Sequence, residues 1–302
     1  MPNFKLTQQE AQAVTTALLG FVKDLTVQKK IKPRTPENLS IEEGEKIVRQ
    51  MNCQACHTIE GEGGAVQDSI KEWLIKSEKQ PEADAAKLLE NSSPPNLHGL
   101  GKKAKPDWLF EFLHDPSTTT VRPWLKIRMP TYTFNVAHLN LLVKYFNALD
   151  KEEFPFAEKI DTSLSQEEYK MAENLFSLLD CMKCHVVGSH LPTGTKDTWA
   201  PNLMVAKTKL KPEWIIHWIQ GPNKLLPGTK MPAFLDTPES GPEDVLNGDE
   251  NEQVRVLRNY LLTITNDTIV GTQPAIQAAP EKPAAAPTEA PNADEPTPSA
   301  TK

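Results

Sequence analysis

The chain has 302 residues, of which 38% are hydrophobic and 24% charged, and its formal net charge is −7. These values are typical of a folded protein with about two domains. The acidic balance argues against a nucleic-acid partner, which needs a basic face, and no apolar run reaches the roughly 20 residues of a transmembrane segment.

The chain begins with the string MPNF, and the segment behind it predicts a helix over residues 7–24. Thr7 and Glu10 form a capping box. Apolar residues then recur at helical spacing: Ala11, Val14, Leu18 and Phe21. No signal peptide is recognised in this stretch, because AVTTALLGFV is short and contains two Thr. Residues 29–39 are charged, contain Pro and are predicted to form a linker.

All four cysteines of the chain lie in two short strings, CQACH and CMKCH. A chain with 4 Cys and 7 His at this length carries about 0.001 such C-x-x-C-H strings by chance. Two thiols on one turn can form thioethers with one porphyrin, and the next residue then places an imidazole beneath the iron. The strings therefore predict two haem c attachment sites: Cys53, Cys56 and His57, and Cys181, Cys184 and His185.

Two C-x-x-C pairs are also compatible with a four-sulfur zinc site or with thioredoxin-like redox pairs. The pairs lie 128 residues apart and each carries a His, which disfavours zinc bound by four thiolates. Neither pair has the strand–helix context of a thioredoxin motif, and a disulfide between adjacent turns would constrain very little. Haem attachment is therefore the favoured interpretation.

The segment before the first string predicts a helix, with Ser40 and Glu43 as its capping box. Between His57 and the proline-rich stretch that follows it lie about 22 residues more than at the corresponding place after the second string. This insertion, at about residues 65–93, is polar and shows helical spacing. We expect it to be a surface element or a contact for a partner.

An internal repeat follows each string. The stretch PPNLHGLGKKAKPDWLFEFLHDP aligns with APNLMVAKTKLKPEWIIHWIQGP at a constant offset of 106 residues. The identical pairs are Pro95/Pro201, Asn96/Asn202, Leu97/Leu203, Lys103/Lys209, Lys105/Lys211, Pro106/Pro212, Trp108/Trp214 and Pro116/Pro222. Each copy then reaches a Met-Pro pair, at Met129 and at Met231.

The repeated side chains have more than one interpretation. Trp108 and Trp214 are expected to pack against haem, or to donate the ring N–H to a propionate. The four repeated lysines are expected to be solvated, with propionate neutralisation or steering of a partner as the alternatives. His98 and Met204, at paired positions, lie too early in the repeats to be iron ligands and are expected to pack in their loops.

Further helices are predicted around the second string. Ser165 and Glu168 form the capping box of the helix before it. VAHLNLLVKYFNAL at 136–149 and NEQVRVLRNYLLTI at 251–264 are predicted to close the two repeats. Residues 151–164 are charged, contain Pro and are predicted to be a linker. Strand signals are almost absent, so the sequence predicts an all-α fold.

These features together resemble the class I cytochrome c family, whose domains run from an N-terminal helix through C-x-x-C-H to a Met-Pro ligand and a closing helix. The resemblance implies two tandem cytochrome c domains, at residues 37–152 (the first repeat) and 161–266 (the second repeat), each holding one covalent haem c. Met129 and Met231 would be the sixth iron ligands, opposite the histidine of each string. The expected iron ligands are His57, Met129, His185 and Met231.

His–Met ligation fills both axial positions of an iron and leaves no open site for a substrate. The resemblance therefore implies an electron-transfer protein rather than an enzyme. It would serve a respiratory chain as a subunit or partner of a quinol-oxidising complex, a dehydrogenase, or a terminal reductase or oxidase. Haem c attachment implies a periplasmic location. A dihaem cytochrome c peroxidase, which opens one iron to peroxide, is the alternative.

The string MPNF resembles the Met-Pro-aromatic strings of the two repeats, each of which precedes a closing helix. Residues 1–28 are therefore interpreted as the end of a third cytochrome c domain, whose C-x-x-C-H half would lie upstream in a longer, trihaem polypeptide. A Met that merely starts the chain is the alternative. The isolated helix is expected to lie loosely or fray. Residues 267–302, rich in Pro and Ala, are predicted to be disordered.

Overall fold

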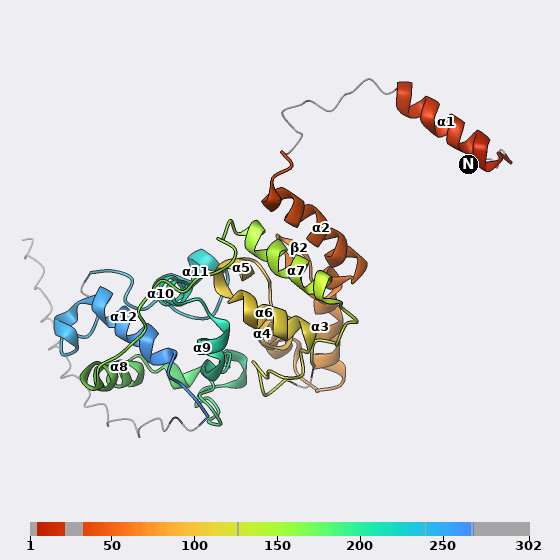
Figure 1. Ribbon diagram of the computed structural model, residues 1–302. Coiled ribbons are helices and arrows are strands. Elements are labelled where there is room, and N and C mark those ends of the chain that lie inside the picture. Colours follow the sequence, from red (N-terminus) through yellow and green to blue (C-terminus); the bar gives the residue numbers. More distant parts are fainter. Residues whose placement is uncertain (1–4, 22–32, 126, 239, 267, 269–302) are drawn as a thin grey trace, which may run out of the picture. The chain divides into compact units, whose positions relative to one another are not determined.

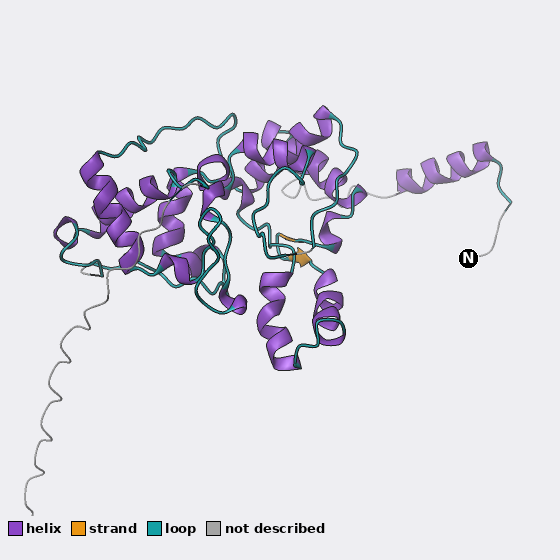
Figure 2. Ribbon diagram, turned by 90° about the horizontal axis from the view of Figure 1, so that it is seen from below, coloured by secondary structure: helices purple, strands orange, loops and turns teal. Residues whose placement is uncertain are grey.

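The structure is a computed structural model that describes residues 5–21, 33–125, 127–238, 240–266 and 268 (Figure 1). Helices dominate these residues. The strands in the described part of the chain are β1 Thr58–Ile59 and β2 Glu62–Gly63, which pair as a small antiparallel hairpin (Figure 2). The prediction of a helical fold is confirmed apart from this hairpin. The string MPNF, residues 29–32 and nearly all of the predicted tail lie outside the described residues.

Helix α2 opens the first repeat, and it begins earlier than its predicted capping box. Thr35 caps the helix, because its hydroxyl accepts a hydrogen bond from Asn38 N at 3.2 Å, and Pro36 occupies the first turn, where no N–H is needed. Ser40 lies inside the helix and donates its hydroxyl to Pro36 O at 2.8 Å. The predicted capping box of Ser40 and Glu43 is therefore wrong, and α2 takes up the last residues of the predicted linker. The helical elements of this repeat are α2 Pro36–Gln50, η2 Cys53–Ala55, α3 Val66–Lys76, α4 Glu82–Ser92, α5 Leu100–Lys103, α6 Pro106–His114 and α7 Val136–Leu149.

The insertion consists of the two helices α3 and α4, which pack on each other. Their contact buries Ile70, Leu74 and Ala85 in a small core that is separate from the main core of the first repeat. The acidic and basic side chains of both helices remain on the outside. The prediction of a helical, polar insertion is confirmed, and its few apolar residues explain why it holds together.

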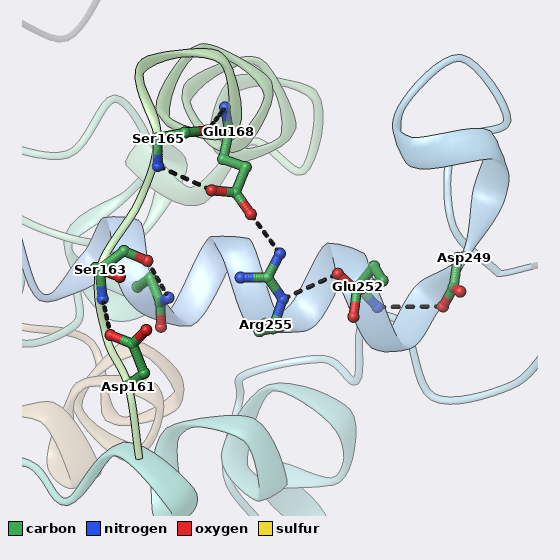
Figure 3. A network of polar contacts seen from close by, with 8 residues as sticks. Asp161, Ser163, Ser165, Glu168, Asp249, Glu252 and Arg255 are labelled. Atoms are coloured by element: carbon green, nitrogen blue, oxygen red, sulfur yellow. Dashed lines mark hydrogen bonds and ion pairs between the residues drawn. The ribbon is translucent and has the colours of Figure 1, made fainter.

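The second repeat contains counterparts of α2, η2, α5, α6 and α7, and within its described residues it lacks the insertion and the hairpin. Its helices are α8 Gln166–Leu178, η3 Cys181–Lys183, η4 Lys196–Thr198, η5 Leu203–Val205, α9 Ala206–Lys209, α10 Pro212–Gln220, α11 Pro222–Leu225, η6 Leu246–Gly248 and α12 Glu250–Leu261. The capping box predicted for α8 is confirmed: the Ser165 hydroxyl accepts from Glu168 N, and the Glu168 carboxylate accepts from Ser165 N at 2.8 Å. The Glu168 carboxylate also accepts from Arg255 of α12 at 2.5 Å, so the first and last helices of the repeat are joined (Figure 3).

In both repeats the first helix packs on the last, α2 on α7 and α8 on α12 (Figure 1). Gly44 lies where α2 meets Tyr145 of α7, and a Cβ at this glycine would overlap the Tyr145 side chain. The residue at the equivalent place in α8, nine positions before the first cysteine, is the fully buried Ala172. There the buried Tyr260 of α12 packs against Phe176 with ring centroids 5.4 Å apart. Small residues on the first helix thus allow a close approach of the closing helix.

Helix α1 Gln8–Phe21 begins as predicted, with the Thr7 hydroxyl accepting from Glu10 N and the Glu10 carboxylate accepting from Thr7 N. Its apolar residues Val14, Leu18 and Leu19 are exposed. The described part of this helix therefore has no core of its own. Across the described parts of the chain, no helix combines the length and apolarity that crossing a bilayer would require.

The two repeats contact each other through equivalent segments. Ala104 and Leu210, which are 106 positions apart, pair as an antiparallel bridge. Two backbone hydrogen bonds flank it: Lys105 N donates to Lys209 O at 2.8 Å, and Lys211 N donates to Lys103 O at 3.0 Å. Because each bond has its equivalent in the opposite direction, a local two-fold axis passes between Ala104 and Leu210.

Two of the repeated lysines make ion pairs beside this contact. Lys211 is 2% exposed, and its Nζ lies 3.0 Å from the carboxylate of Glu152. Lys105 Nζ lies 2.7 Å from the carboxylate of Glu158. Both glutamates belong to the predicted linker at 151–164, which is therefore fixed to the repeats. The prediction that these lysines are solvated is wrong, because equivalent segments of the two repeats meet here: Lys211 is buried, Lys105 is half-buried, and each is paired with a glutamate.

The insertion of the first repeat also contacts the second repeat. Asn91 of α4 donates its amide to Asp197 O at 2.5 Å. Lys230, which precedes Met231, donates its ammonium to Asp197 O and to Lys87 O of α4, both at 2.7 Å. Part of the insertion surface is therefore used within the chain.

Candidate haem-binding sites

The two C-x-x-C-H strings fold in the same way. Each follows a residue in the left-handed region, Asn52 with φ 53° and Asp180 with φ 52°, which ends the preceding helix. A single 3-10 turn then forms, in which the N–H of the second cysteine donates to the carbonyl of the first, at 3.2 Å in the first string and 3.3 Å in the second. The histidine N–H donates to the same carbonyl, at 2.9 Å and 3.0 Å. One turn thus carries both thiols and the imidazole, as attachment to a single porphyrin requires.

The two histidines are held by the same backbone contact. His57 Nδ1 lies 2.8 Å from Pro95 O, and His185 Nδ1 lies 2.9 Å from Pro201 O. A carbonyl oxygen can only accept, so Nδ1 carries the proton, and in the neutral ring Nε2 keeps its lone pair for a metal. Burial lowers the pKa of both imidazoles and therefore favours the neutral form. Pro95 and Pro201 are paired positions of the repeat, so the proline-rich loop fixes the ring at both sites.

One cavity of about 1370 Å³ receives side chains from both strings. Its lining includes all eight residues predicted to hold haem: Cys53, Cys56, His57, Met129, Cys181, Cys184, His185 and Met231. Met204 does not line it, whereas His98, at the paired position, does line it; His98 is exposed, and its Nδ1 lies 3.4 Å from Glu60. The structure therefore brings the predicted ligands together, and it separates Met204 from them.

The four cysteine thiols are free and half-buried. Burial raises the pKa of the Cys53 thiol, and it raises the pKa of the Cys181 thiol to about 12. Both thiols are therefore protonated at neutral pH. Within the described residues no three Cys, His, Asp or Glu side chains come together as a metal-binding group. The two thiol pairs thus belong to separate sites and do not form one four-sulfur centre.

The repeated tryptophans and lysines lie at the junction of the two sites. Trp108 stacks on Phe112 with centroids 4.8 Å apart, and its ring N–H is buried without a hydrogen-bond partner among the described residues. Lys209 of the other repeat places its Nζ 4.6 Å above the Trp108 ring, and Lys103 places its Nζ 4.8 Å above the ring of Trp214. All four side chains line the cavity.

The sequence does not identify Arg122, which also lines the cavity. Its guanidinium donates to the backbone carbonyls of Asn91 at 3.2 Å and Ser93 at 2.8 Å. Burial lowers its pKa to about 10. Arg122 falls between the end of the aligned repeat and Met129, so the repeat offered no signal for it.

Residues 41–150 match the family model of cytochrome c. This part of the chain is a cytochrome c domain, a class of domain that carries covalently bound haem c and transfers electrons. The second repeat, at 161–266, lies outside the match. No curated protein and no solved structure matches the chain significantly.

The residues of the first repeat fit the haem c that its family implies. Two free thiols precede an imidazole whose Nδ1 is already bonded, so that only Nε2 remains for iron. The thioether of Met129 lines the same cavity. The unpaired N–H of Trp108 provides a donor for an acidic group of the porphyrin. The site thus supplies attachment, two axial ligands of suitable type and a polar contact.

Proposed function

We propose that the chain is a dihaem c-type cytochrome that passes single electrons in a respiratory chain. Haem c supplies a one-electron Fe(II)/Fe(III) couple. In the first repeat Cys53 and Cys56 would attach it, with His57 and Met129 as axial ligands. In the second repeat Cys181 and Cys184 would attach it, with His185 and Met231 as axial ligands. The observation that carries this proposal is the histidine contact, which recurs in both repeats with the same donor and acceptor type, at 2.8 Å and 2.9 Å.

The side chains have distinct tasks in this function. The carbonyls of Pro95 and Pro201 fix the ring orientation of each histidine and increase its basicity. The thioethers of Met129 and Met231 would favour the reduced iron and so raise the potential. The apolar walls, which include Leu109 and Leu257, would exclude water from the metal. With both axial positions filled by the protein, electron transfer is favoured over chemistry on a bound substrate.

We further propose that the partners are redox proteins, among them a membrane-bound respiratory complex such as a quinol-oxidising complex, a dehydrogenase, or a terminal reductase or oxidase. A periplasmic location follows from the attachment of haem c outside the cytoplasmic membrane. Helix α1 would be the closing helix of a further cytochrome c domain. The exposure of Val14, Leu18 and Leu19 supports this, since such a face requires a partner.

The test is an absorbance spectrum of the purified holoprotein with its haem content per chain. Two haems c per chain and a weak far-red band from the sulfur–iron bond in the oxidised state are expected. Replacing either ligand, Met129→Ala or Met231→Ala, should remove about half of that band, because each repeat contributes one sulfur ligand. Met204→Ala is the matched control, since Met204 does not line the cavity, and the band should remain whole.

One haem per chain would overturn the dihaem proposal. A far-red band that survives in full in one of the two ligand variants would remove that methionine from the ligand set. Rapid catalytic turnover of hydrogen peroxide by the reduced protein would favour the peroxidase instead.

A further inference from the structure

Among the described cationic side chains that line the cavity where the two repeats meet, three are half-buried: Lys103, Arg122 and Lys209. Among the described residues, none of them forms an ion pair with a carboxylate. This differs from the neighbouring Lys105 and Lys211, each of which has a glutamate within 3.0 Å. Lys105 and Lys211 therefore have carboxylate partners, whereas Lys103 and Lys209 have none among the described residues.

Without an anionic partner, these half-buried cations destabilise the folded protein. Burial lowers the pKa of Lys103 to about 8, and burial together with the charges of Lys103 and Arg122 lowers the pKa of Lys209. Partly buried positive charges that face one another are expected to be retained only if an anionic group neutralises them. Haem c carries two propionate carboxylates, and these are the anionic groups that the proposed function brings to this cavity.

Each of the two lysines lies over a tryptophan of the other repeat. Lys103 belongs to the first repeat. Its Nζ lies 4.8 Å from the ring of Trp214 and 5.6 Å from the ring of Trp218, both on α10 of the second repeat. Lys209 belongs to the second repeat, and its Nζ lies 4.6 Å from the ring of Trp108 in the first repeat. The local two-fold axis between Ala104 and Leu210 relates these two contacts.

We infer that Lys103 and Lys209 bind haem propionates across the repeat interface, Lys103 on the haem of the second repeat and Lys209 on the haem of the first. The inference rests on the proposed dihaem function. The unpaired N–H of Trp108, beneath Lys209, would donate to the same propionate as Lys209. Each haem would then be held by side chains of both repeats, so haem binding would stabilise the contact between them.

The test is a redox titration of the holoprotein that resolves one wave per haem. Met129→His and Met231→His assign the waves, since each replaces one sulfur ligand and moves one wave to lower potential. Removal of a cation near a haem favours the oxidised iron. Lys103→Gln should therefore lower the equilibrium constant for reduction of the second-repeat haem by about tenfold, with a smaller effect on the first-repeat haem. Lys209→Gln should have its larger effect on the first-repeat haem.

Lys207→Gln, on the same helix as Lys209 but exposed and away from the cavity, is the control and should leave both waves in place. Lys103→Arg and Lys209→Arg keep the charge and should keep the wild-type potentials, whereas shifts as large as those of the Gln variants would overturn the inference. A larger shift on the haem of the lysine's own repeat, or no shift, would also overturn it. Haem content is measured first: one haem per chain defeats the proposed function itself, and two haems without crossed shifts defeat only this inference.

Discussion

Asn96 and Asn202 hold the loops that present Pro95 and Pro201 to the two histidines. The side-chain carbonyl of each asparagine accepts the N–H of the residue two positions later, at 2.9 Å from His98 and 3.0 Å from Met204. Their surroundings differ. Asn202 is 5% exposed and also donates its amide to Gly188 O at 2.9 Å, whereas Asn96 is exposed. The same turn is thus built into the core in one repeat and into the surface in the other.

Asn202→Ala should destabilise the protein by about 1–3 kcal/mol, because it leaves Gly188 O and the N–H of Met204 without partners in a buried place. Asn96→Ala, the equivalent change, should cost only about 0.5 kcal/mol, as is usual at the surface. Denaturant unfolding of both holoproteins, followed by the haem absorbance, measures the difference. Equal losses in the two variants would show that burial of Asn202 has no part in the effect.

The motif letters predicted eight candidate haem-binding residues, all of which line the cavity, because cysteine, histidine and methionine carry their chemistry in the side chain. The carbonyls of Pro95 and Pro201 could not be predicted as histidine acceptors, since every residue has a carbonyl and only the loop path decides where it points. Arg122 was missed for a related reason. Its partners are the backbone carbonyls of Asn91 and Ser93, which lie 31 and 29 positions away.

Helices α2 and α8 were predicted from the same pattern, a serine followed three residues later by glutamate. The pattern caps α8 and fails at α2, where Thr35-Pro36 starts the helix further upstream and leaves Ser40 in its interior. A capping box can act only where no stronger start precedes it. In α8 the box also takes part in tertiary structure, since the Glu168 carboxylate binds both Ser165 and Arg255 (Figure 3).

These bonds lower the pKa of Glu168 from 4.5 to about 2, with Arg255 as the largest cause and Ser165 next. The folded-state pKa lies below the unfolded value, so the contribution to stability is present above about pH 4.5 and is lost as the pH falls toward 2. Glu168→Gln should therefore be less stable than wild type at pH 7, and the gap should close in acid. Melting temperatures from pH 7 down to pH 2 measure it.

Glu167→Gln provides the comparison, because Glu167 is the exposed neighbour on the same turn of α8. Its melting curve should run parallel to that of the wild type. A constant gap between Glu168→Gln and the wild type at every pH would contradict the assignment of the low pKa to the bonds with Arg255 and Ser165.

The contact between the repeats was the part of the molecule that the sequence predicted least. Matching letters at an offset of 106 indicate that two segments fold alike, but they do not indicate that equivalent residues touch. The structure pairs Ala104 with Leu210 and buries Lys211 against Glu152. The charged stretch at 151–164 was therefore predicted as a linker, although two of its glutamates neutralise lysines at this contact.

Lys230 links the insertion to the loop that carries Met231, through hydrogen bonds to Lys87 O of α4 and to Asp197 O. Lys230→Met removes both bonds at an exposed place and should cost about 1 kcal/mol. The loss should be felt at the neighbouring Met231, so half of the far-red band should disappear at a lower denaturant concentration than in the wild type. Arg128→Met is the matched control, because Arg128 precedes Met129 and donates within its own loop, to the carbonyls of Leu125 and Ile127. If the band is lost at the same denaturant concentrations in both variants, the insertion does not stabilise the second repeat. A shift in Lys230→Met alone would show that the insertion stabilises the loop that carries Met231.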